Sequence, residues 1–275
     1  MRIDDALILA EISLVKSDSP LLDAQLLLGH VLDKPTVYLM TWPEKVLTVD
    51  QKTQFEYLIE QRLNEKPVAH LTGSRGFWSL DLKVNDSTLI PRPDTEILVE
   101  TALKYCKPDS RILDLGTGSG AIILALASEL TAAQCVGVDF SYDAVQLAQE
   151  NLRDLAFDNV SILQSNWFEN VQGQFDVIVS NPPYIDEADH HLDQGDVRFE
   201  PLSALVSGNK GLADIQLIIK QAKAYLKQGA PLLIEHGFDQ GEAVQAIFKQ
   251  YNYRLISTVK DYGNNDRVTF AFNTE

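Results

Sequence analysis

The sequence is poor in cysteine, in basic residues and in long apolar runs. Its two cysteines, Cys106 and Cys135, have no ligand or redox spacing, which predicts reduced, buried thiols. The formal net charge of −16 disfavours a broad surface that neutralises nucleic-acid phosphates. No apolar run approaches transmembrane length, and residues 1–14 carry acids and lack a signal-peptide cleavage pattern. These absences predict a cytoplasmic protein with no membrane association and no direct nucleic-acid binding.

The start of the chain predicts a small bundle of four or five helices, over residues 1–72. Pro20 follows Ser19 at a helix start, where proline suits the first turn. Thr48 with Gln51 predicts a capping box, in which each side chain binds the other residue's backbone. Residues 73–89 mix apolar residues with turn formers, which predicts a hairpin that links the bundle to a second domain, residues 90–275.

Predicted strands alternate with predicted helices from Arg111 onward, which indicates a mostly parallel sheet with helices on both faces. Only a short turn, Tyr262–Asp266, separates the last two strands, so they are expected to pair as an antiparallel hairpin. The fold class is therefore α/β, a seven-stranded sheet with its last strand antiparallel. The expected strands are Arg111–Leu115, Gln134–Asp139, Val160–Gln164, Phe175–Ser180, Pro231–Glu235, Tyr253–Lys260 and Arg267–Asn273, and the expected helices between them are Ala121–Leu130, Tyr142–Leu155 and Leu212–Lys227.

A glycine-rich turn follows the first of these strands, in the stretch Asp114-Leu-Gly-Thr-Gly-Ser-Gly120. Glycines let a backbone approach a ligand closely. Asp139 ends the next strand, where an acid accepts both hydroxyls of a ribose. The nicotinamide fingerprint expects a glycine at position 121, which is Ala121 here, and Asp114 suits an ammonium group better than a pyrophosphate. The stretch is typical of the S-adenosylmethionine site of class I methyltransferases.

Two aromatic residues follow the third strand, Trp167 and Phe168. Both suit a sandwich around an adenine ring, and Asn166 suits a hydrogen bond to its edge. Core packing is an equal alternative for Phe168.

The stretch Ser180-Asn-Pro-Pro-Tyr184 follows the fourth strand. The two prolines cannot donate backbone hydrogen bonds, so they end the strand in a stiff loop. A planar NH2 group carries two donors, which the Asn181 side chain and the Pro182 carbonyl can accept. Tyr184 can stack on the plane of the bound group. In the class I order the first and fourth strands are neighbours, so this loop is expected to face the glycine-rich turn.

The sequence resembles the release factor glutamine N5-methyltransferases over nearly its whole length. The resemblance rests on IPRPDTE (90–96), DLGTGSG (114–120), NPPYI (181–185), VRFEPLSAL (197–205) and IEHG (234–237). It implies methyl transfer from S-adenosylmethionine, without a metal, to the glutamine of the Gly-Gly-Gln loop of peptide chain release factors 1 and 2. The expected substrate and catalytic residues are Asn181, Pro182, Pro183 and Tyr184, and the expected cofactor contacts are Asp114, Gly116, Thr117, Gly118, Ser119, Gly120, Asp139, Phe140, Asn166, Trp167, Phe168 and Asn181.

Two positions depart from the family pattern. Asp94 stands where the family usually has Glu, and Asn166 stands where it usually has Asp. An amide oxygen still accepts a bond from the adenine amino group, so cofactor binding is expected to survive.

Three other functions compete with this one. An adenine N6-methyltransferase shares the Asn-Pro-Pro-Tyr motif, but a flipped base needs a cationic path that the acidic composition disfavours. A non-catalytic S-adenosylmethionine-binding adaptor would not need the complete motif. A nicotinamide dehydrogenase is the most distant alternative.

Overall fold

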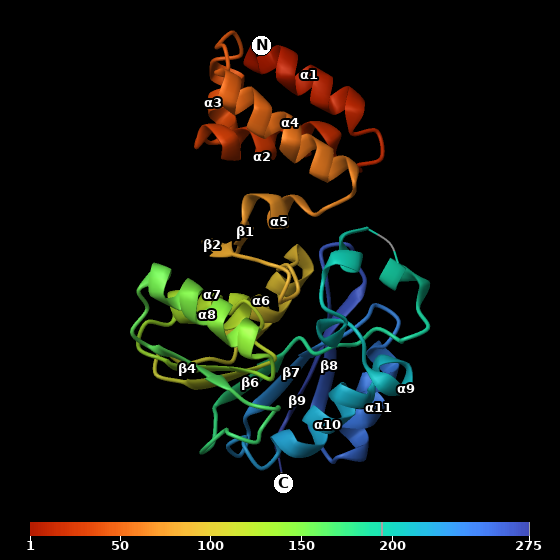
Figure 1. The fold of residues 1–275 in the computed structure, drawn as a ribbon. Helices are drawn as coiled ribbons and strands as arrows, with labels where there is room; N and C mark the ends of the chain where they lie inside the picture. Colours follow the sequence, from red (N-terminus) through yellow and green to blue (C-terminus); the bar gives the residue numbers. More distant parts are fainter. Residues whose placement is uncertain (194, 275) are drawn as a thin grey trace. The chain divides into compact units, whose positions relative to one another are not determined.

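The computed structural model describes residues 1–193 and 195–274, and it divides into two compact units (Figure 1). The helical unit comprises Met1–Ser74 and His191–Phe199, and the sheet unit comprises Arg75–His190 and Glu200–Glu275. The helical unit contains five helices in its N-terminal stretch, α1 (Ile3–Ser13), α2 (Pro20–Leu32), α3 (Thr36–Thr41), α4 (Val49–Leu63) and α5 (Val68–Thr72). The predicted bundle of four or five helices is thus present in the described residues.

Local signals set the helix starts of this unit. Pro20 occupies the first turn of α2, as predicted. The capping box of α4 is also confirmed, because Gln51 N–H donates to Thr48 Oγ1 at 3.2 Å and Thr48 N–H donates to Gln51 Oε1 at 3.0 Å. A cap of this kind stabilises a helix by about 1 kcal/mol. Phe55 of α4 then packs into a core that includes Leu27 and Leu28 of α2.

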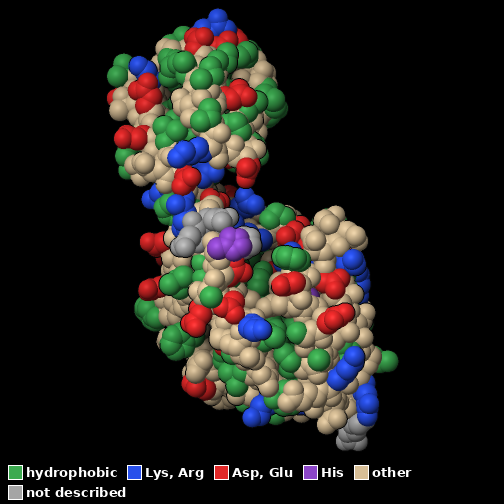
Figure 2. Space-filling view, turned by 90° about the vertical axis from the view of Figure 1, so that its right-hand side faces the viewer, with side chains coloured by type: hydrophobic (Ala, Val, Ile, Leu, Met, Phe, Trp, Pro, Cys, Tyr) green, Lys and Arg blue, Asp and Glu red, His purple; other side chains and the backbone are tan. Residues whose placement is uncertain are grey.

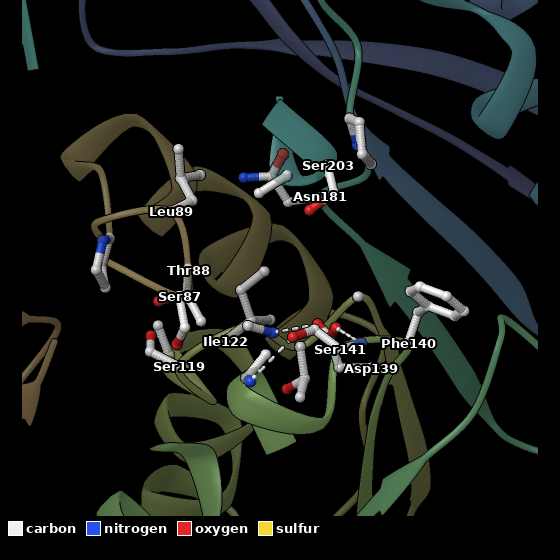
Figure 3. A pocket seen from close by; sticks show the side chains of 18 of the residues that line it. Ser87, Thr88, Leu89, Ser119, Ile122, Asp139, Phe140, Ser141, Asn181 and Ser203 are labelled. Atoms are coloured by element: carbon white, nitrogen blue, oxygen red, sulfur yellow. Dashed lines mark hydrogen bonds between the residues drawn. The ribbon is translucent and has the colours of Figure 1, made fainter. Parts of the chain in front are cut away.

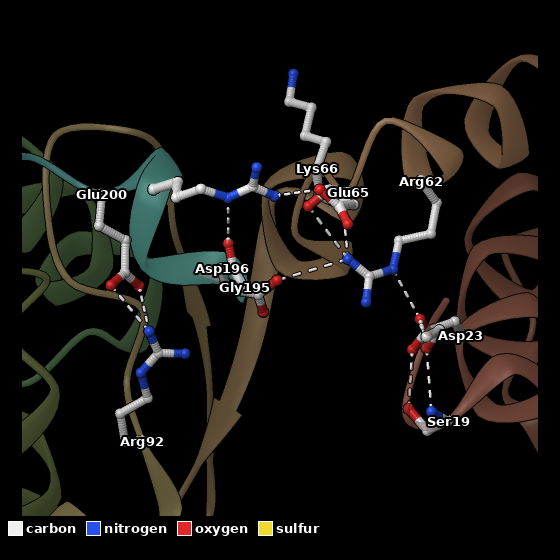
Figure 4. Close-up of polar contacts among 11 residues, drawn as sticks. Ser19, Asp23, Arg62, Glu65, Lys66, Arg92, Gly195, Asp196 and Glu200 are labelled. Atoms are coloured by element: carbon white, nitrogen blue, oxygen red, sulfur yellow. Dashed lines mark hydrogen bonds and ion pairs between the residues drawn. The ribbon is translucent and has the colours of Figure 1, made fainter. Parts of the chain in front are cut away.

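A buried ion pair joins α2 and α4 within the helical unit. Arg62 Nε donates to Asp23 Oδ2 at 2.7 Å, and Asp23 is 6% exposed (Figure 4). The segment His191–Phe199 is attached to the same unit through charges. Arg62 also pairs with Asp196 at 3.5 Å, and Arg198 pairs with Glu65. A segment distant in sequence is therefore part of the helical unit, which the local sequence pattern did not predict.

The sheet unit is built around a seven-stranded sheet of order β5-β4-β3-β6-β7-β9-β8. Its strands are β3 (Arg111–Leu115), β4 (Gln134–Asp139), β5 (Val160–Gln164), β6 (Val177–Ser180), β7 (Pro231–Glu235), β8 (Arg254–Lys260) and β9 (Asp266–Phe272). The first five are parallel, and β9 is antiparallel to both β7 and β8, as predicted for the terminal hairpin. A separate two-stranded hairpin, β1 (Ser74–Phe77) with β2 (Leu80–Lys83), precedes the sheet.

Helices cover both faces of this sheet. The helices are α6 (Glu96–Leu103), α7 (Ala121–Glu129), α8 (Tyr142–Leu155), α9 (Gly208–Gly211), α10 (Ala213–Ala222) and α11 (Gly241–Gln250), and short 3-10 turns lie at Pro93–Thr95, His190–Asp193, Gly195–Phe199 and Leu202–Ala204. Alternate strand residues enter two different cores: Ile112 packs with α6 and α7, and Leu113 packs with α10 and α11. This alternation is the period of a strand buried on both faces.

Several element bounds differ from the sequence-based ones by one to a few residues: α7 ends at Glu129, β8 starts at Arg254 and β9 runs over Asp266–Phe272. The fourth strand starts at Val177 and not at Phe175, because the Phe175 backbone bonds to Tyr225 and Lys227 beyond α10. The α10 helix ends at Ala222, before the predicted Lys227. In the described residues, no helix is long and apolar enough to cross a membrane.

Candidate active site

A cavity of about 460 Å³ opens at the carboxyl ends of β3, β4 and β6 in the sheet unit (Figure 3). It lies at the topological switch point of the sheet. The strands that follow β3 in the chain are added first on one side of it, as β4 and β5, and then on the other side, as β6 and β7. Ten of the residues singled out in the sequence line it: Gly116, Thr117, Gly118, Ser119, Asp139, Phe140, Asn166, Trp167, Asn181 and Pro183. The glycine-rich turn and the Asn-Pro-Pro-Tyr loop are thus brought to one cavity.

The glycine-rich turn is shaped by backbone conformations that favour glycine. Gly120 has φ of 86° and precedes α7, and a Cβ there would lie 2.9 Å from Leu124 Cδ1. Gly118 has φ of 55°, and its N–H donates to Asp139 Oδ2 at 2.9 Å. The other oxygen of Asp139 accepts the Ser141 N–H at 2.9 Å. Burial raises the pKa of Asp139 against these hydrogen bonds.

Asp114 lies at the end of β3 and is fully buried. Its Oδ2 accepts a 2.6 Å hydrogen bond from the Thr117 hydroxyl, and its Oδ1 has no hydrogen-bond partner among the described residues. Burial raises the pKa of this carboxyl to about 7, despite the Thr117 hydroxyl. In its ionised form, a buried carboxylate beside a cavity favours a cationic ligand in that cavity.

The Asn-Pro-Pro-Tyr loop leaves β6 in a fixed direction. The Ser180 hydroxyl donates to the Leu115 carbonyl at 2.8 Å, which ties the end of β6 to the end of β3. The Tyr184 carbonyl accepts from Gln240 Nε2 at 2.9 Å. Gly211 packs so close to this carbonyl that a Cβ at position 211 would lie 1.9 Å from the oxygen. The loop backbone is therefore held from both sides.

Asn181 is oriented by a residue from another part of the chain. Its Nδ2 donates to the Thr95 hydroxyl at 3.3 Å, and Thr95 is 4% exposed. In the described part of the chain no group donates to Asn181 Oδ1, so this oxygen is available as an acceptor. An amide oxygen at the rim of a cofactor-sized cavity is the feature that an NH2-bearing substrate requires.

The sequence comparisons agree with this geometry. The chain is 50% identical over 263 residues to a release factor glutamine methyltransferase of Aliivibrio fischeri, covering 94% of this chain and 93% of the relative. It is 53% identical over 257 residues to the protein of that name from Escherichia coli, covering 93% of each. The chain belongs to the release factor glutamine methyltransferase family.

Two family models match successive parts of the chain. A model described as the PrmC N-terminal domain matches residues 5–73, and one described as a methyltransferase domain matches residues 106–270. Among solved structures, a methyltransferase from Pyrococcus furiosus superposes with a TM-score of 0.57 at 18% identity, covering 78% of this chain and 98% of that one. This likeness shows the methyltransferase fold.

Five of the expected site residues do not line this cavity: Asp114, Gly120, Phe168, Pro182 and Tyr184. For Phe168 the structure shows the core-packing alternative that the sequence had left open. It is 3% exposed and stacks on Tyr225 with ring centroids 4.6 Å apart, so it packs in the core. Trp167 takes the place beside the cavity, and its ring is 3.5 Å from where a Cβ on Gly116 would lie. The backbone of Trp167 has a positive φ of 48°.

The sequence analysis missed one wall of the cavity. Phe77, Ser87, Thr88 and Leu89 line it, although residues 73–89 were expected only to link two domains. Thr88 is 2% exposed and its hydroxyl has no hydrogen-bond partner among the described residues. The opposite wall includes Ser203 and Ala204, which belong to the VRFEPLSAL motif. That motif was the available signal for the second wall, but no local pattern marked the first.

Proposed function

We propose that this protein transfers a methyl group from S-adenosylmethionine to the side-chain amide nitrogen of the glutamine in the Gly-Gly-Gln loop of peptide chain release factors 1 and 2. The observation that carries the proposal is the Asn181 side chain. Its nitrogen is engaged by Thr95 and its oxygen is free to accept, at the rim of a cavity that also contains the glycine-rich turn. The names of its relatives support the same reaction.

The residues around the glycine-rich turn fit S-adenosylmethionine. Asp114 does not itself line the cavity, but its buried carboxyl accepts a hydrogen bond from Thr117, which does, so its ionised form places a negative charge close to the positively charged part of the cofactor. Asp139 accepts the Gly118 N–H on one oxygen and the Ser141 N–H on the other, and a carboxylate has about four lone-pair sites, so it can still accept from a ribose hydroxyl. Trp167 supplies a flat surface for the adenine, and Asn166 lies beside it on the cavity wall. Asn166 stands where the family usually has Asp. Its Nδ2 donates to Glu169 Oε1 at 2.8 Å, so a carboxylate lies next to Asn166 in spite of this difference.

When bound, S-adenosylmethionine supplies a methyl group on a positively charged sulfur. The protein's own task is to hold the glutamine NH2 in line with that carbon. Asn181 Oδ1 and the Pro182 carbonyl accept the two N–H bonds, which turns the nitrogen lone pair out of conjugation with the carbonyl. Tyr184 covers the amide plane, and burial raises the pKa of its hydroxyl, so the hydroxyl stays neutral.

Positioning and electrostatics replace a strong base in this scheme. A primary amide is not deprotonated by any side chain near neutral pH, so its reactivity must come from orientation. Orientation of this kind lowers a barrier by roughly 7–11 kcal/mol. The same two oxygens then stabilise the positive charge that develops on the nitrogen, and this interaction is stronger in the transition state than in the ground state. The leaving group is S-adenosylhomocysteine, and the methylated nitrogen loses its extra proton to water.

We further propose that the helical unit recognises the release factor away from its glutamine. A single side chain offers little contact area, and specificity for a protein needs more. Figure 2 shows hydrophobic side chains, in green, on the surface of this unit. The helix α1 of this unit has three exposed apolar side chains, Ile8, Leu9 and Ile12, which are 54%, 58% and 66% exposed, and we call them the α1 apolar face.

Mass spectrometry of release factors provides the test. Each purified factor is incubated with the protein and S-adenosylmethionine, and the peptide that contains Gly-Gly-Gln is searched for one added methyl group. The adenine N6-methyltransferase alternative is tested in parallel with labelled cofactor and DNA. Label in DNA and none in the release factors would overturn the proposal, whereas tight cofactor binding without transfer to either would favour the adaptor.

A further inference from the structure

A buried polar cluster lies behind Asn181 in the sheet unit, and the mechanism above does not use it. Glu235, at the end of β7, is 2% exposed. Its Oε1 accepts a hydrogen bond of 3.5 Å from the Tyr184 hydroxyl. Its Oε2 has no full hydrogen-bond partner among the described residues. A buried carboxylate with so few direct partners is costly to a fold, so its place directly behind the substrate loop calls for a reason.

Thr95 connects this carboxylate to Asn181. The Thr95 hydroxyl lies near the Glu235 carboxyl and, as a hydrogen-bond donor, lowers the pKa of that carboxyl. The same hydroxyl accepts the Asn181 Nδ2 at 3.3 Å. The three residues therefore form a chain from β7 through the 3-10 turn Pro93–Thr95 to the substrate loop.

The direction of hydrogen bonding along this chain follows from chemistry. A threonine hydroxyl both donates and accepts, so Thr95 alone cannot tell the nitrogen of an asparagine amide from its oxygen. An ionised carboxylate only accepts. When Thr95 gives its one proton to Glu235, its oxygen can only accept from Asn181. The Asn181 nitrogen must then face Thr95, and Oδ1 must face the substrate.

We propose that Glu235 is a positioning residue that, through the Thr95 hydroxyl, fixes which end of the Asn181 amide is presented to the substrate. This inference rests on the proposed function, because it assigns the accepting role of Asn181 to an acid that never touches the glutamine. It also explains why the acid is buried: a solvated carboxylate would bind water in place of Thr95.

The protonation state of Glu235 then controls the direction of the hydrogen bonds that run from Asn181 through Thr95 to Glu235. Burial raises the pKa of Glu235 to about 7; the Thr95 and Tyr184 hydroxyls and the charge of Arg267 oppose this rise, and the nearby Asp94 adds to it. Below that pH a protonated Glu235 can donate to Thr95, whose proton then turns toward Asn181 and favours the flipped amide. Turnover at saturating cofactor is therefore expected to rise as the pH increases through about 7.

The variants Glu235→Gln, Thr95→Val and their combination test this chain. Each single variant should lower kcat about tenfold, because losing one hydrogen bond to a charged group changes an equilibrium or a rate by about this factor. The double variant should be no worse than the poorer single one, because both changes break the same chain. Thr95→Ser keeps the hydroxyl and should restore most of the turnover. Glu242→Gln, the same change on an exposed acid of α11, is the matched control.

Two readouts separate positioning from a merely structural role. The rise of kcat with pH through about 7 should be absent in Glu235→Gln and present in Glu242→Gln. The nuclear Overhauser contact from the Asn181 side-chain NH2 protons to Thr95 should be present in the wild-type protein and weakened in Glu235→Gln. The thermal midpoint of Glu235→Gln should not fall at pH 8, because the change removes a buried charge.

These readouts also separate this inference from the proposed function. The nuclear Overhauser contact needs no substrate, so it tests the chain even if release factors are not methylated. Wild-type kcat in Glu235→Gln, losses that multiply in the double variant, or an unchanged Asn181 contact would each overturn the positioning role. Methylation of release factors by the wild-type protein would still support the proposed function in all three cases.

Discussion

The backbone N–H of Gly118 donates to Asp139 Oδ2 at 2.9 Å, so the turn after β3 is fastened to the acid at the end of β4. The acid's second oxygen accepts the Ser141 N–H at the start of α8. Three segments of the cofactor cavity therefore share one carboxylate. Its position is set by the protein's own backbone, which favours binding because little ordering remains to be done when the ligand arrives.

Asp139→Ala should mainly weaken cofactor binding. Loss of charge-assisted hydrogen bonds to two hydroxyls costs roughly 2–3 kcal/mol, or roughly 30- to 150-fold in Kd. Asp139→Asn is the matched control, since it keeps one accepting oxygen and should lose less. Calorimetry with S-adenosylmethionine measures both. Unchanged affinity in Asp139→Ala would remove this residue from the cofactor site.

Asn181→Ala should nearly abolish turnover and leave most of the cofactor affinity. Its oxygen matters most as the amide nitrogen gains charge, and removing one such group typically lowers kcat by about 100-fold or more. Mass spectrometry of the release factor measures the rate, and calorimetry on the same preparation confirms that the cavity is intact. Near-normal turnover by a folded variant would contradict the role of Asn181.

Cofactor affinity should depend on pH through Asp114. Burial raises the pKa of this carboxyl to about 7, and its ionised form is the one that attracts a cation. Affinity is therefore lost as the pH falls through about 7, several-fold between about pH 7.5 and about pH 6. Calorimetric titrations over this range should show the change, and Asp114→Asn should bind weakly with no such dependence. An equally steep dependence in Asp114→Asn would assign it to another group.

The α1 apolar face should serve the whole release factor and not the isolated glutamine loop. Replacing the exposed Ile12 with Lys should lower kcat/KM on the full-length release factor at least several-fold, as is typical of an anchor in an interface. Activity on a short peptide with Gly-Gly-Gln should stay the same, because the peptide is too small to require this face. Glu11→Lys, an equal introduction of charge on the same helix, is the control.

Point substitutions test this face better than removal of the helical unit. The segment His191–Phe199 belongs to that unit and is bound there by the Arg62–Asp196 and Glu65–Arg198 pairs. A protein that starts near Gly73 would leave these charges without partners and would disturb the chain on either side of the segment. An equal loss of kcat/KM in the Ile12→Lys and Glu11→Lys variants would indicate a general charge effect and would contradict the role of Ile12 as an interface anchor.

Local sequence patterns were sufficient for most of the elements. The strands β3, β4, β5 and β7 and the helix α8 have the bounds that were expected, because each has a clear period and a clear stop. For α8 the start is set by a cap: the Ser141 hydroxyl accepts the Ala144 N–H at 3.3 Å at the N-terminus of the helix. The glycine-rich turn and the two prolines were recognisable for the same reason, since their conformations are properties of single residues.

Only the tertiary structure decided which side chains meet at the site. Phe168 and Trp167 are adjacent in sequence and equally aromatic, yet one packs on Tyr225 and the other borders the cavity. Thr95 and Asn181 are 86 positions apart, and Tyr184 and Glu235 are 51 apart. Periodicity reports the face of an element on which a residue lies, but not the partner it meets there. The order of strands in the sheet brings such partners together, because parallel strands that are distant in sequence end at the same edge.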